Sequence, residues 1–138
     1  EGPVWVAAEQ ALYWLDVKGR AIFRMDDDGV ERFETPMRVG SIAPRRAGGF
    51  VAGTEHGLAL VDRAIESFDI FCDPEPERPG NRFNDGKVDR QGRFWAGTMH
   101  DPEEQATPAR SSAISSDSLS VPGIERLTMC GARGAPAP

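Results

Sequence analysis

The sequence predicts an all-β protein built from repeated β-propeller blades, and three observations carry this prediction. Short runs of aromatic or β-branched residues recur around Tyr13, Phe50 and Phe94, at separations of 37 and 44 residues. A four-stranded propeller blade occupies about 40 to 50 residues. Turn residues separate the runs, and no window of helical length keeps the i, i+3, i+4 apolar spacing of an amphipathic helix.

The first two repeats each supply four strands, and the third supplies at least two. Short apolar or alternating runs between turn residues predict these strands. They are expected at residues 3–6, 11–16, 21–25, 30–33, 41–43, 48–54, 57–61, 67–71, 87–89 and 92–98. The pattern therefore amounts to about two and a half to three blades.

The acidic run before Gly29 is similar to the middle of an EF-hand loop. Placing Gly29 at loop position six puts Arg24 at position one and Thr35 at position twelve, where an EF-hand needs acidic ligands. The match fails at both ends. We therefore expect a hairpin with Asp28-Gly29 at its tip.

The propeller pattern ends near residue 108. All eleven aromatic residues lie between Trp5 and Trp95, whereas six of the eight serines fall within residues 111–120. We divide the chain into a partial propeller, residues 1–108, and an irregular, non-homologous tail, residues 109–138, expected to be disordered. A genuine polar tail and a repeat interrupted by a frame-shift or misjoined exon both explain the change. The start Glu1-Gly2-Pro3 lacks an initiator methionine and predicts a fragment.

Composition excludes several classes of partner. The 138 residues are 39% hydrophobic and 28% charged, with a net charge of −6, so neither a nucleic-acid partner nor a membrane span is expected. Cys72 and Cys130 lie far apart and have no CxxC companion. Two free thiols in a reducing cytoplasm are the expectation, rather than a disulfide or a zinc knuckle.

The segment 81–87, Asn-Arg-Phe-Asn-Asp-Gly-Lys, is the most polar place in the repeat pattern. Asp85-Gly86 is a turn signal, and we expect a turn here with sheet resuming directly after it. A turn does not require the neighbouring polar groups. Asn84 and Asp85 offer oxygen ligands and Arg82 offers a planar fork of donors, a mixture suited to a polyoxygenated small molecule beside a divalent cation.

Other polar and aromatic residues are weaker candidates. His56 and His100 each follow a strand, and we expect solvated loop residues, with a general-base role as the alternative. Glu103 and Glu104 are expected to be solvated carboxylates. The three tryptophans are expected to pack the blades rather than to stack against sugar rings.

Three motifs together resemble one family. They are residues 1–5, Glu-Gly-Pro-Val-Trp; residues 39–43, Val-Gly-Ser-Ile-Ala; and residues 81–89 followed by 92–99. These motifs are similar to those of the senescence marker protein, gluconolactonase and luciferin-regenerating enzyme family, also called regucalcin-like. The resemblance covers residues 1 to about 104 and so matches the N-terminal part of the family's propeller.

The resemblance implies a six-bladed β-propeller that hydrolyses sugar lactones, with one divalent cation in a central funnel. Glu1 corresponds to a metal ligand, Arg82 and Asn84 correspond to substrate-binding positions, and Asp85, beside the metal, is a second candidate ligand. In the family the cation is calcium, zinc, manganese or magnesium, and another acidic substrate contact lies near the positions of Glu103 and Glu104. Two later ligands of the family have no counterpart in this sequence, so weak or absent cation binding is expected, and no catalytic residue is assigned.

Two functions of different kinds follow from these motifs. The first is a metal-dependent sugar-lactone hydrolase acting on a small-molecule lactone, present here as a truncated form that is impaired or inactive alone. The second is a non-enzymatic calcium- or sugar-acid-binding propeller, because a fold does not fix a chemistry. A non-functional product of a damaged gene is a third explanation. The sequence leaves the oligomeric state open.

Overall fold

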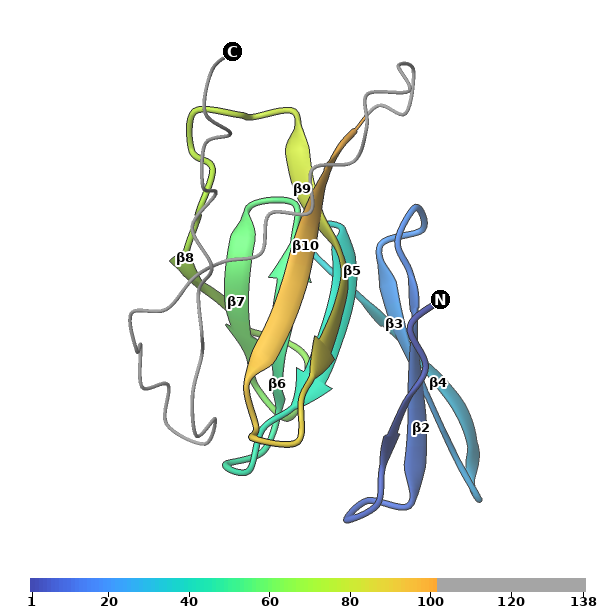
Figure 1. Ribbon diagram of the computed structural model, residues 1–138. Helices are drawn as coiled ribbons and strands as arrows, with labels where there is room; N and C mark the ends of the chain where they lie inside the picture. Colours follow the sequence, from blue (N-terminus) through green and yellow to red (C-terminus); the bar gives the residue numbers. More distant parts are fainter. Residues whose placement is uncertain (102–138) are drawn as a thin grey trace.

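A computed structural model describes residues 1–101, and within that range the chain consists of strands and their connections (Figure 1). Ten strands form three antiparallel sheets, in the orders β1-β2-β3-β4, β5-β6-β7-β8 and β10-β9. Their bounds are β1 Val4–Val6, β2 Ala11–Asp16, β3 Ala21–Asp26, β4 Gly29–Glu34, β5 Val39–Pro44, β6 Phe50–Thr54, β7 Gly57–Val61, β8 Phe68–Cys72, β9 Asn81–Val88 and β10 Phe94–His100. The all-β prediction is confirmed.

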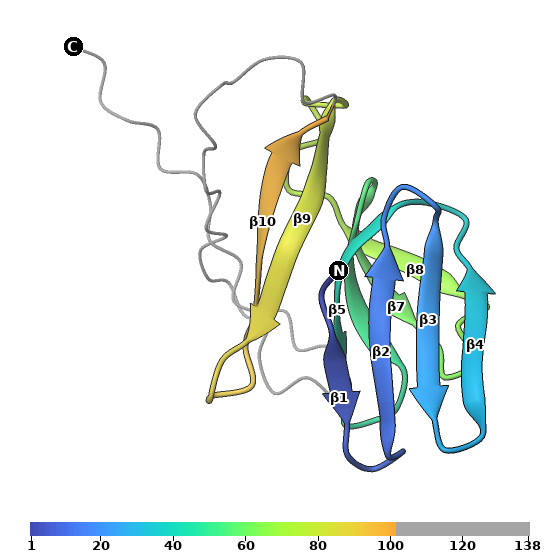
Figure 2. The same ribbon diagram turned by 90° about the vertical axis from the view of Figure 1, so that its right-hand side faces the viewer.

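The first sheet is a regular meander of neighbouring hairpins (Figure 2). In β2, Tyr13 and Leu15 are buried while Trp14, on the opposite face, stacks on Phe23 of β3 with ring centroids 5.3 Å apart. The period of two is that of a strand with one buried face. The hairpin predicted before Gly29 is present, and its two-residue loop lies one position earlier, at residues 27–28.

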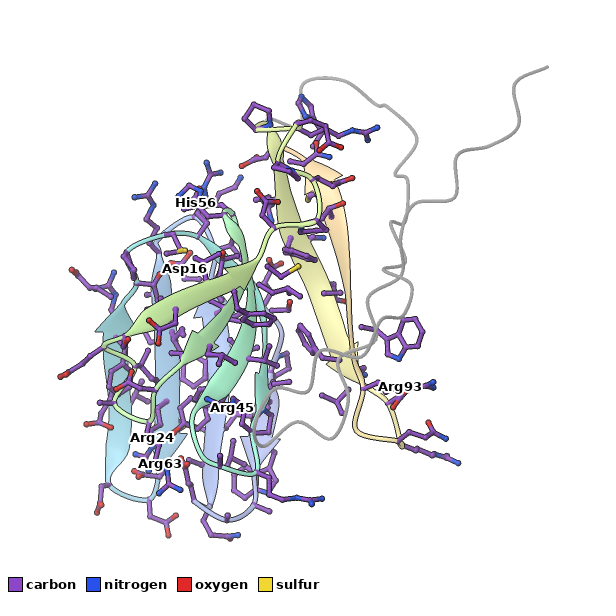
Figure 3. The ribbon with its side chains drawn as sticks, turned by 90° about the vertical axis from the view of Figure 1, so that its left-hand side faces the viewer. Asp16, Arg24, Arg45, His56, Arg63 and Arg93 are labelled. Atoms are coloured by element: carbon purple, nitrogen blue, oxygen red, sulfur yellow. The ribbon has the colours of Figure 1, made fainter. Side chains whose placement is uncertain are left out.

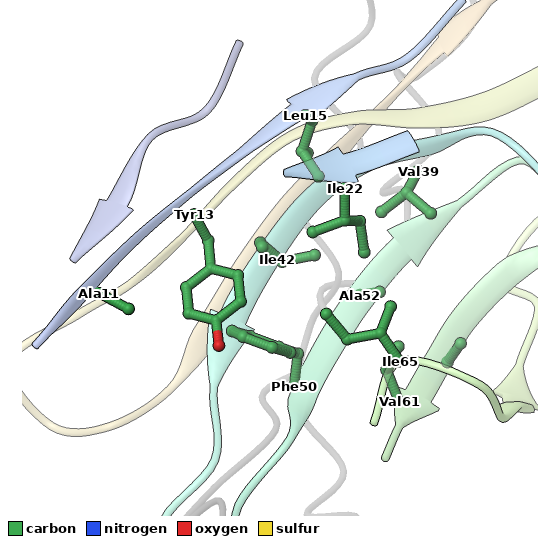
Figure 4. Close-up of a cluster of buried hydrophobic side chains, with 11 residues drawn as sticks. Ala11, Tyr13, Leu15, Ile22, Val39, Ile42, Phe50, Ala52, Val61 and Ile65 are labelled. Carbon is green, nitrogen blue, oxygen red and sulfur yellow. The ribbon is translucent and has the colours of Figure 1, made fainter. Parts of the chain in front are cut away.

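The first and second sheets share a hydrophobic core (Figure 4). Tyr13 of β2 meets Phe50 of β6 edge to face, with ring centroids 4.9 Å apart. Edge-to-face contact places the positive rim of one ring against the negative face of the other. The buried members are Ala11, Tyr13, Leu15, Ile22, Val39, Ile42, Phe50, Ala52, Ala59, Val61 and Ile65.

A second core joins the second and third sheets. Phe83 of β9 and Phe94 of β10 are each 2% exposed and pack with Val51 and Leu58. The prediction of a turn at residues 81–87 is wrong, because this segment forms most of β9. Burial of Phe83 against the second sheet outweighs the local turn preference of Asp85-Gly86.

The tryptophans differ in their packing. Trp14 is half-buried against Phe23, whereas Trp5 is 56% exposed and Trp95 is 36% exposed. Within residues 1–101, the prediction that tryptophans pack the blades therefore holds for Trp14 and not for Trp5 or Trp95.

The predictions for Glu103, Glu104, Cys130 and the tail, residues 109–138, lie outside the described residues. In the part of the chain that the structure describes, no helix is long and apolar enough to cross a membrane.

Candidate functional site

The inner strands of all three sheets line one open cavity of about 660 Å³. The residues at its wall come from the chain start and β1, from β5, and from the second half of β9. The β9–β10 hairpin stands beside the first sheet, with the N-terminus between them in Figure 2. The lining residues are 1–5, 40–44 and 84–88.

Two β-bulges form the wall between β5 and β9. In β9, Phe83 pairs with Thr98 and Gly86 pairs with Ala96, so Asn84 and Asp85 together face a single residue of β10. A bulge of this kind inserts one extra residue and breaks the strict alternation of side chains along a strand. Asn84 and Asp85 are neighbours in the sequence, and both line the cavity.

The second bulge, in β5, explains why Gly40 stands at this position. Val39 pairs with Thr54 and Ser41 pairs with Gly53, which leaves Gly40 as the extra residue. A Cβ atom on Gly40 would lie 2.4 Å from the carbonyl oxygens of both Phe83 and Asn84. Only glycine lets the two bulged strands approach this closely.

The two predicted cation ligands both reach this cavity. Glu1, before β1, and Asp85, in β9, both line it and both are exposed. The backbone of Glu1 is tied to β2, because its carbonyl oxygen accepts a hydrogen bond of 2.8 Å from Leu15 N. Asp85 Oδ1 accepts a hydrogen bond of 2.8 Å from Gly86 N, which leaves Oδ2 available to a ligand.

The two predicted substrate-binding residues lie on different sides of the cavity wall. Asn84 lines the 660 Å³ cavity, whereas Arg82 lines a second cavity of about 280 Å³. Arg82 Nη1 donates to Asn84 Oδ1 at 3.2 Å and to the carbonyl oxygen of Phe83 at 3.2 Å. With Oδ1 of Asn84 accepting from Arg82, the amide NH₂ of Asn84 is available to donate to a ligand oxygen.

The two histidines lie away from the larger cavity. His56 lines the smaller cavity. In Figure 3 it lies at one end of the molecule, and Arg93, at the tip of the β9–β10 hairpin, lies at the other end. His100 Nδ1 lies 3.3 Å from Asn81 Oδ1 at the start of β9. Neither imidazole lines the cavity that holds Glu1, Asn84 and Asp85, so the geometry gives no support to a general-base role there.

Sequence reasoning missed one polar side chain of the cavity wall. Ser41 of β5 is 3% exposed, and its hydroxyl has no hydrogen-bond partner among residues 1–101. A buried hydroxyl without a partner is unfavourable, and most such groups in proteins are paired with protein or water. The sequence does contain an indication of this residue, because Ser41 is the one hydroxyl residue in the otherwise apolar segment 39–43.

Comparison with known proteins gives a consistent family. A protein-family profile described as SMP-30/Gluconolactonase/LRE-like region matches residues 1–128. The 6-deoxy-6-sulfogluconolactonase of Pseudomonas putida is 36% identical over 107 residues, covering 76% of this chain and 37% of that protein. Regucalcin of Danio rerio is 39% identical over 101 residues, covering 72% and 34%. The chain thus spans about a third of the length of these curated relatives.

Solved structures give the same result for the fold. Regucalcin from Agrobacterium tumefaciens, described as a calcium-binding protein, superposes with a TM-score of 0.68 at 25% identity, over 73% of this chain and 35% of that one. A luciferin-regenerating enzyme superposes with a TM-score of 0.69 at 27% identity, over 74% and 36%. The three sheets are therefore successive blades of a β-propeller, two of them complete and the third represented by two strands within residues 1–101.

Proposed function

The chain belongs to the SMP-30/gluconolactonase/LRE-like family, and from that membership we propose that it carries the N-terminal part of a site that binds and hydrolyses sugar lactones. One observation supports this most directly. Glu1, Asn84 and Asp85, drawn from two blades, line a single cavity of about 660 Å³, which is within the size range of small-molecule sites. A lactonase relative such as the 6-deoxy-6-sulfogluconolactonase agrees with this substrate class.

Asn84 and Arg82 act together in the proposed site. In hydrolysis a water oxygen adds to the lactone carbonyl carbon, the ring C–O bond breaks, and the product is an open-chain sugar acid. The Asn84 amide donates to a substrate oxygen, while the Arg82 guanidinium, bonded to Asn84 Oδ1, orients that amide. The guanidinium also places positive charge behind the oxygen that becomes negative during the reaction.

The described residues supply part of a cation site. Glu1 and Asp85 are oxygen donors of the type that calcium, magnesium and manganese prefer. No cluster of three His, Cys, Asp or Glu that could hold a metal occurs within residues 1–101, and calcium takes about six to eight oxygen ligands. Glu1 and Asp85 are therefore too few to form a complete cation site by themselves. The roles proposed for Asn84 and Arg82 do not require a bound cation.

A cation titration tests that conclusion. Because two carboxylates leave most of a coordination shell to water, we expect dissociation constants of about 1 mM or weaker for calcium, manganese, magnesium and zinc. Isothermal titration calorimetry of the whole chain measures them, with Asp85→Asn as the variant and Asp69→Asn, on β8, as the control. Micromolar binding that Asp85→Asn removes would show a more complete site.

The second candidate function is a non-enzymatic protein that binds a cation or a sugar acid. One observation favours it: the calcium-binding description of the Agrobacterium regucalcin. The two functions differ in turnover. Both predict binding of a sugar acid in the cavity, and the enzyme alone predicts release of acid from a lactone.

Ligand binding and turnover are measured on the same chain. A two-dimensional ¹H–¹⁵N NMR titration with D-gluconate should shift the Asn84 side-chain amide and the Gly86 backbone amide. Asn84→Ala should weaken binding about ten-fold, because one hydrogen bond to a polar ligand is worth about 1.5 kcal/mol. Asn81→Ala is the matched control, since Asn81 lies on the same strand and lines the other cavity.

Turnover is followed by pH-stat titration of D-glucono-1,5-lactone, with and without calcium, manganese or zinc. We expect impaired or absent hydrolysis by this chain alone, together with binding of gluconate. Gluconate binding with weak, cation-stimulated hydrolysis would favour the lactonase, and gluconate binding with no hydrolysis under any of these conditions would favour the non-enzymatic function. No gluconate binding, or binding that Asn84→Ala leaves unchanged, would contradict the proposed site.

A further inference from the structure

A series of alternating charges links all three sheets along one rim. Arg20, between β2 and β3, lies 3.6 Å from Glu55 in the β6–β7 turn. Glu55 accepts hydrogen bonds from Arg38, at 2.9 Å from the backbone N and 3.0 Å from Nε. Arg38 Nη1 also pairs with Asp101, directly after β10, and Asp101 Oδ2 lies 3.3 Å from Arg82 Nε.

Burial distinguishes the Arg82–Asp101 pair of this rim from an exposed ion pair such as Arg32–Glu34. The side chain of Arg82 is 10% exposed and that of Asp101 is 19% exposed. By contrast, the Arg32–Glu34 pair on β4 has side chains 45% and 82% exposed. Exposed pairs contribute little to stability, whereas a buried guanidinium left without a counter-charge is strongly unfavourable. The buried Arg82 therefore needs the charge of Asp101 nearby, whereas the exposed Arg32 does not need that of Glu34.

The position of Asp101 is fixed from two sides. Its backbone N donates to the carbonyl oxygen of Gly80 at 2.8 Å, which ties it to the start of β9. Its carboxylate is paired with Arg38, and Arg38 is anchored to Glu55. Burial alone would raise the pKa of Glu55, but the hydrogen bonds from Arg38 outweigh burial and lower it, so Glu55 stays ionised at neutral pH.

The guanidinium group of Arg82 contacts both Asp101 and the candidate site. Its Nη1 donates to Asn84 Oδ1, whereas its Nε faces Asp101 without a well-aligned hydrogen bond. The carboxylate thus restrains the guanidinium by charge while Nη1 remains directed to the amide. Rotation of the guanidinium away from Asp101 would move Nη1 from Asn84.

We propose that Asp101 is a positioning residue for the sugar-acid site: it holds the guanidinium of Arg82, which in turn fixes the Asn84 amide, and Arg38 ties this arrangement to the second blade. The choice of a sugar acid as ligand rests on the function proposed above. The arrangement of Arg82 by Asp101 does not, so the two are tested separately.

The first test measures the Arg82 side chain without any ligand. In the whole chain labelled with ¹⁵N, the Arg82 Nε–Hε signal is assigned by its loss in Arg82→Lys, and its relaxation gives an order parameter. Asp101→Asn should lower that order parameter and shift the Asn84 side-chain amide, while Asp101→Glu should restore both. Glu34→Gln is the matched control and should change neither.

The second test measures the ligand. With D-gluconate as the probe, Asp101→Asn should weaken binding by up to about ten-fold, the loss expected when the Asn84 amide no longer donates to the ligand, and Asp101→Glu should recover most of it. If the wild-type chain does not bind gluconate, the proposed function fails, and the order parameter still decides the role of Asp101. An Arg82 order parameter unchanged in Asp101→Asn would overturn the positioning role.

A folding defect in Asp101→Asn is covered by a second variant. Arg38→Gln leaves Asp101 and Arg82 in place and removes the tie to the second blade. We expect a smaller fall in the Arg82 order parameter and a smaller loss of gluconate affinity than in Asp101→Asn. If Arg38→Gln matches wild type in both measurements, Arg38 has no part in the positioning of Arg82. If the Arg82 order parameter in Asp101→Glu is as low as in Asp101→Asn, the positioning role of Asp101 is refuted.

Discussion

The first and third sheets differ in the regularity of their strand pairing. In the first sheet, β1 to β4 pair residue by residue through three hairpins with no break in register. In the third sheet, the β9–β10 ladder is interrupted between Phe83 and Gly86. Two polar residues of the candidate site, Asn84 and Asp85, lie in that interruption. Broken pairing thus brings two neighbouring polar side chains to one cavity, while the regular first sheet supplies packing.

The irregularity of β9 depends on the second sheet. The bulge in β5 brings Gly40 against the backbone of Phe83 and Asn84. Phe83, between the two proposed substrate-binding residues, is buried in the second core. The first sheet requires no comparable contact for its own geometry. Substitutions in each sheet can therefore separate its effect on the free energy of unfolding from its effect on ligand binding at the candidate site.

The largest effect is expected for Phe83→Ala. Removing this fully buried ring should lower the free energy of unfolding by about 3–5 kcal/mol and leave a cavity beneath Asn84. Leu15→Ala, in the first core, should cost about 2–5 kcal/mol. Urea unfolding measures both. At a temperature where both variants remain folded, gluconate binding should fall in Phe83→Ala and persist in Leu15→Ala.

Similar behaviour of the two core variants would contradict this division between the sheets. Loss of gluconate binding in Leu15→Ala at a temperature where it is folded would mean that the first sheet shapes the site directly. A cost below about 1 kcal/mol for Phe83→Ala would show that the third sheet is not packed as described, because surface positions show effects of that size.

A smaller but more local effect is expected for Gly40→Ala. The added methyl group meets backbone oxygens that cannot rotate away, so the two bulges must separate, at a cost of about 1–3 kcal/mol. Gly97→Ala is the control: Gly97 lies opposite the β9 bulge, and a Cβ there meets nothing within 4 Å. That change should be neutral or stabilising by up to about 1 kcal/mol. Equal urea midpoints for the two variants would contradict the close packing at Gly40.

The sequence predicts the regular parts of the fold well, because their signals are local. Alternation in Ala11–Asp16 and turn residues on either side place β2 at its observed bounds, and β8 is displaced by one residue. The same local reasoning fails at Asp85-Gly86. A turn signal there is overridden by the burial of Phe83 and by Gly40, which lies more than 40 residues earlier in the chain.

The site could be predicted only in part, for a similar reason. The resemblance of three motifs to a known family placed Glu1, Asn84 and Asp85 together, and all three line one cavity. Their roles in binding stay predictions. Asp101 could not be found from sequence, since its partners Arg38 and Arg82 meet it only after three blades have packed. Ser41 could have been found as a hydroxyl within an apolar strand.

The smallest expected effect is a titration that reports on the first sheet. Tyr13 is the only tyrosine of the chain, so absorbance of tyrosinate near 295 nm follows it alone. Burial, together with the hydrogen bond and charge of Glu9, raises the pKa of Tyr13 to about 12. An unfolded tyrosine ionises near pH 10. The raised pKa means that the contribution of neutral Tyr13 to stability is fully present below about pH 10 and is lost between about pH 10 and 12.

Two variants connect this titration to the contrast between sheets. Glu9→Gln should lower the Tyr13 midpoint without returning it to about 10, because burial is the larger cause and remains. Asp85→Asn, in the third sheet, should leave the midpoint unchanged, because Tyr13 packs between the first two sheets. A midpoint near 10 in the folded wild type would show that Tyr13 is not held in the first core. A midpoint that moves in Asp85→Asn would show instead that the irregular third sheet and the regular first sheet are coupled through the second, and the division between packing and binding would have to be given up.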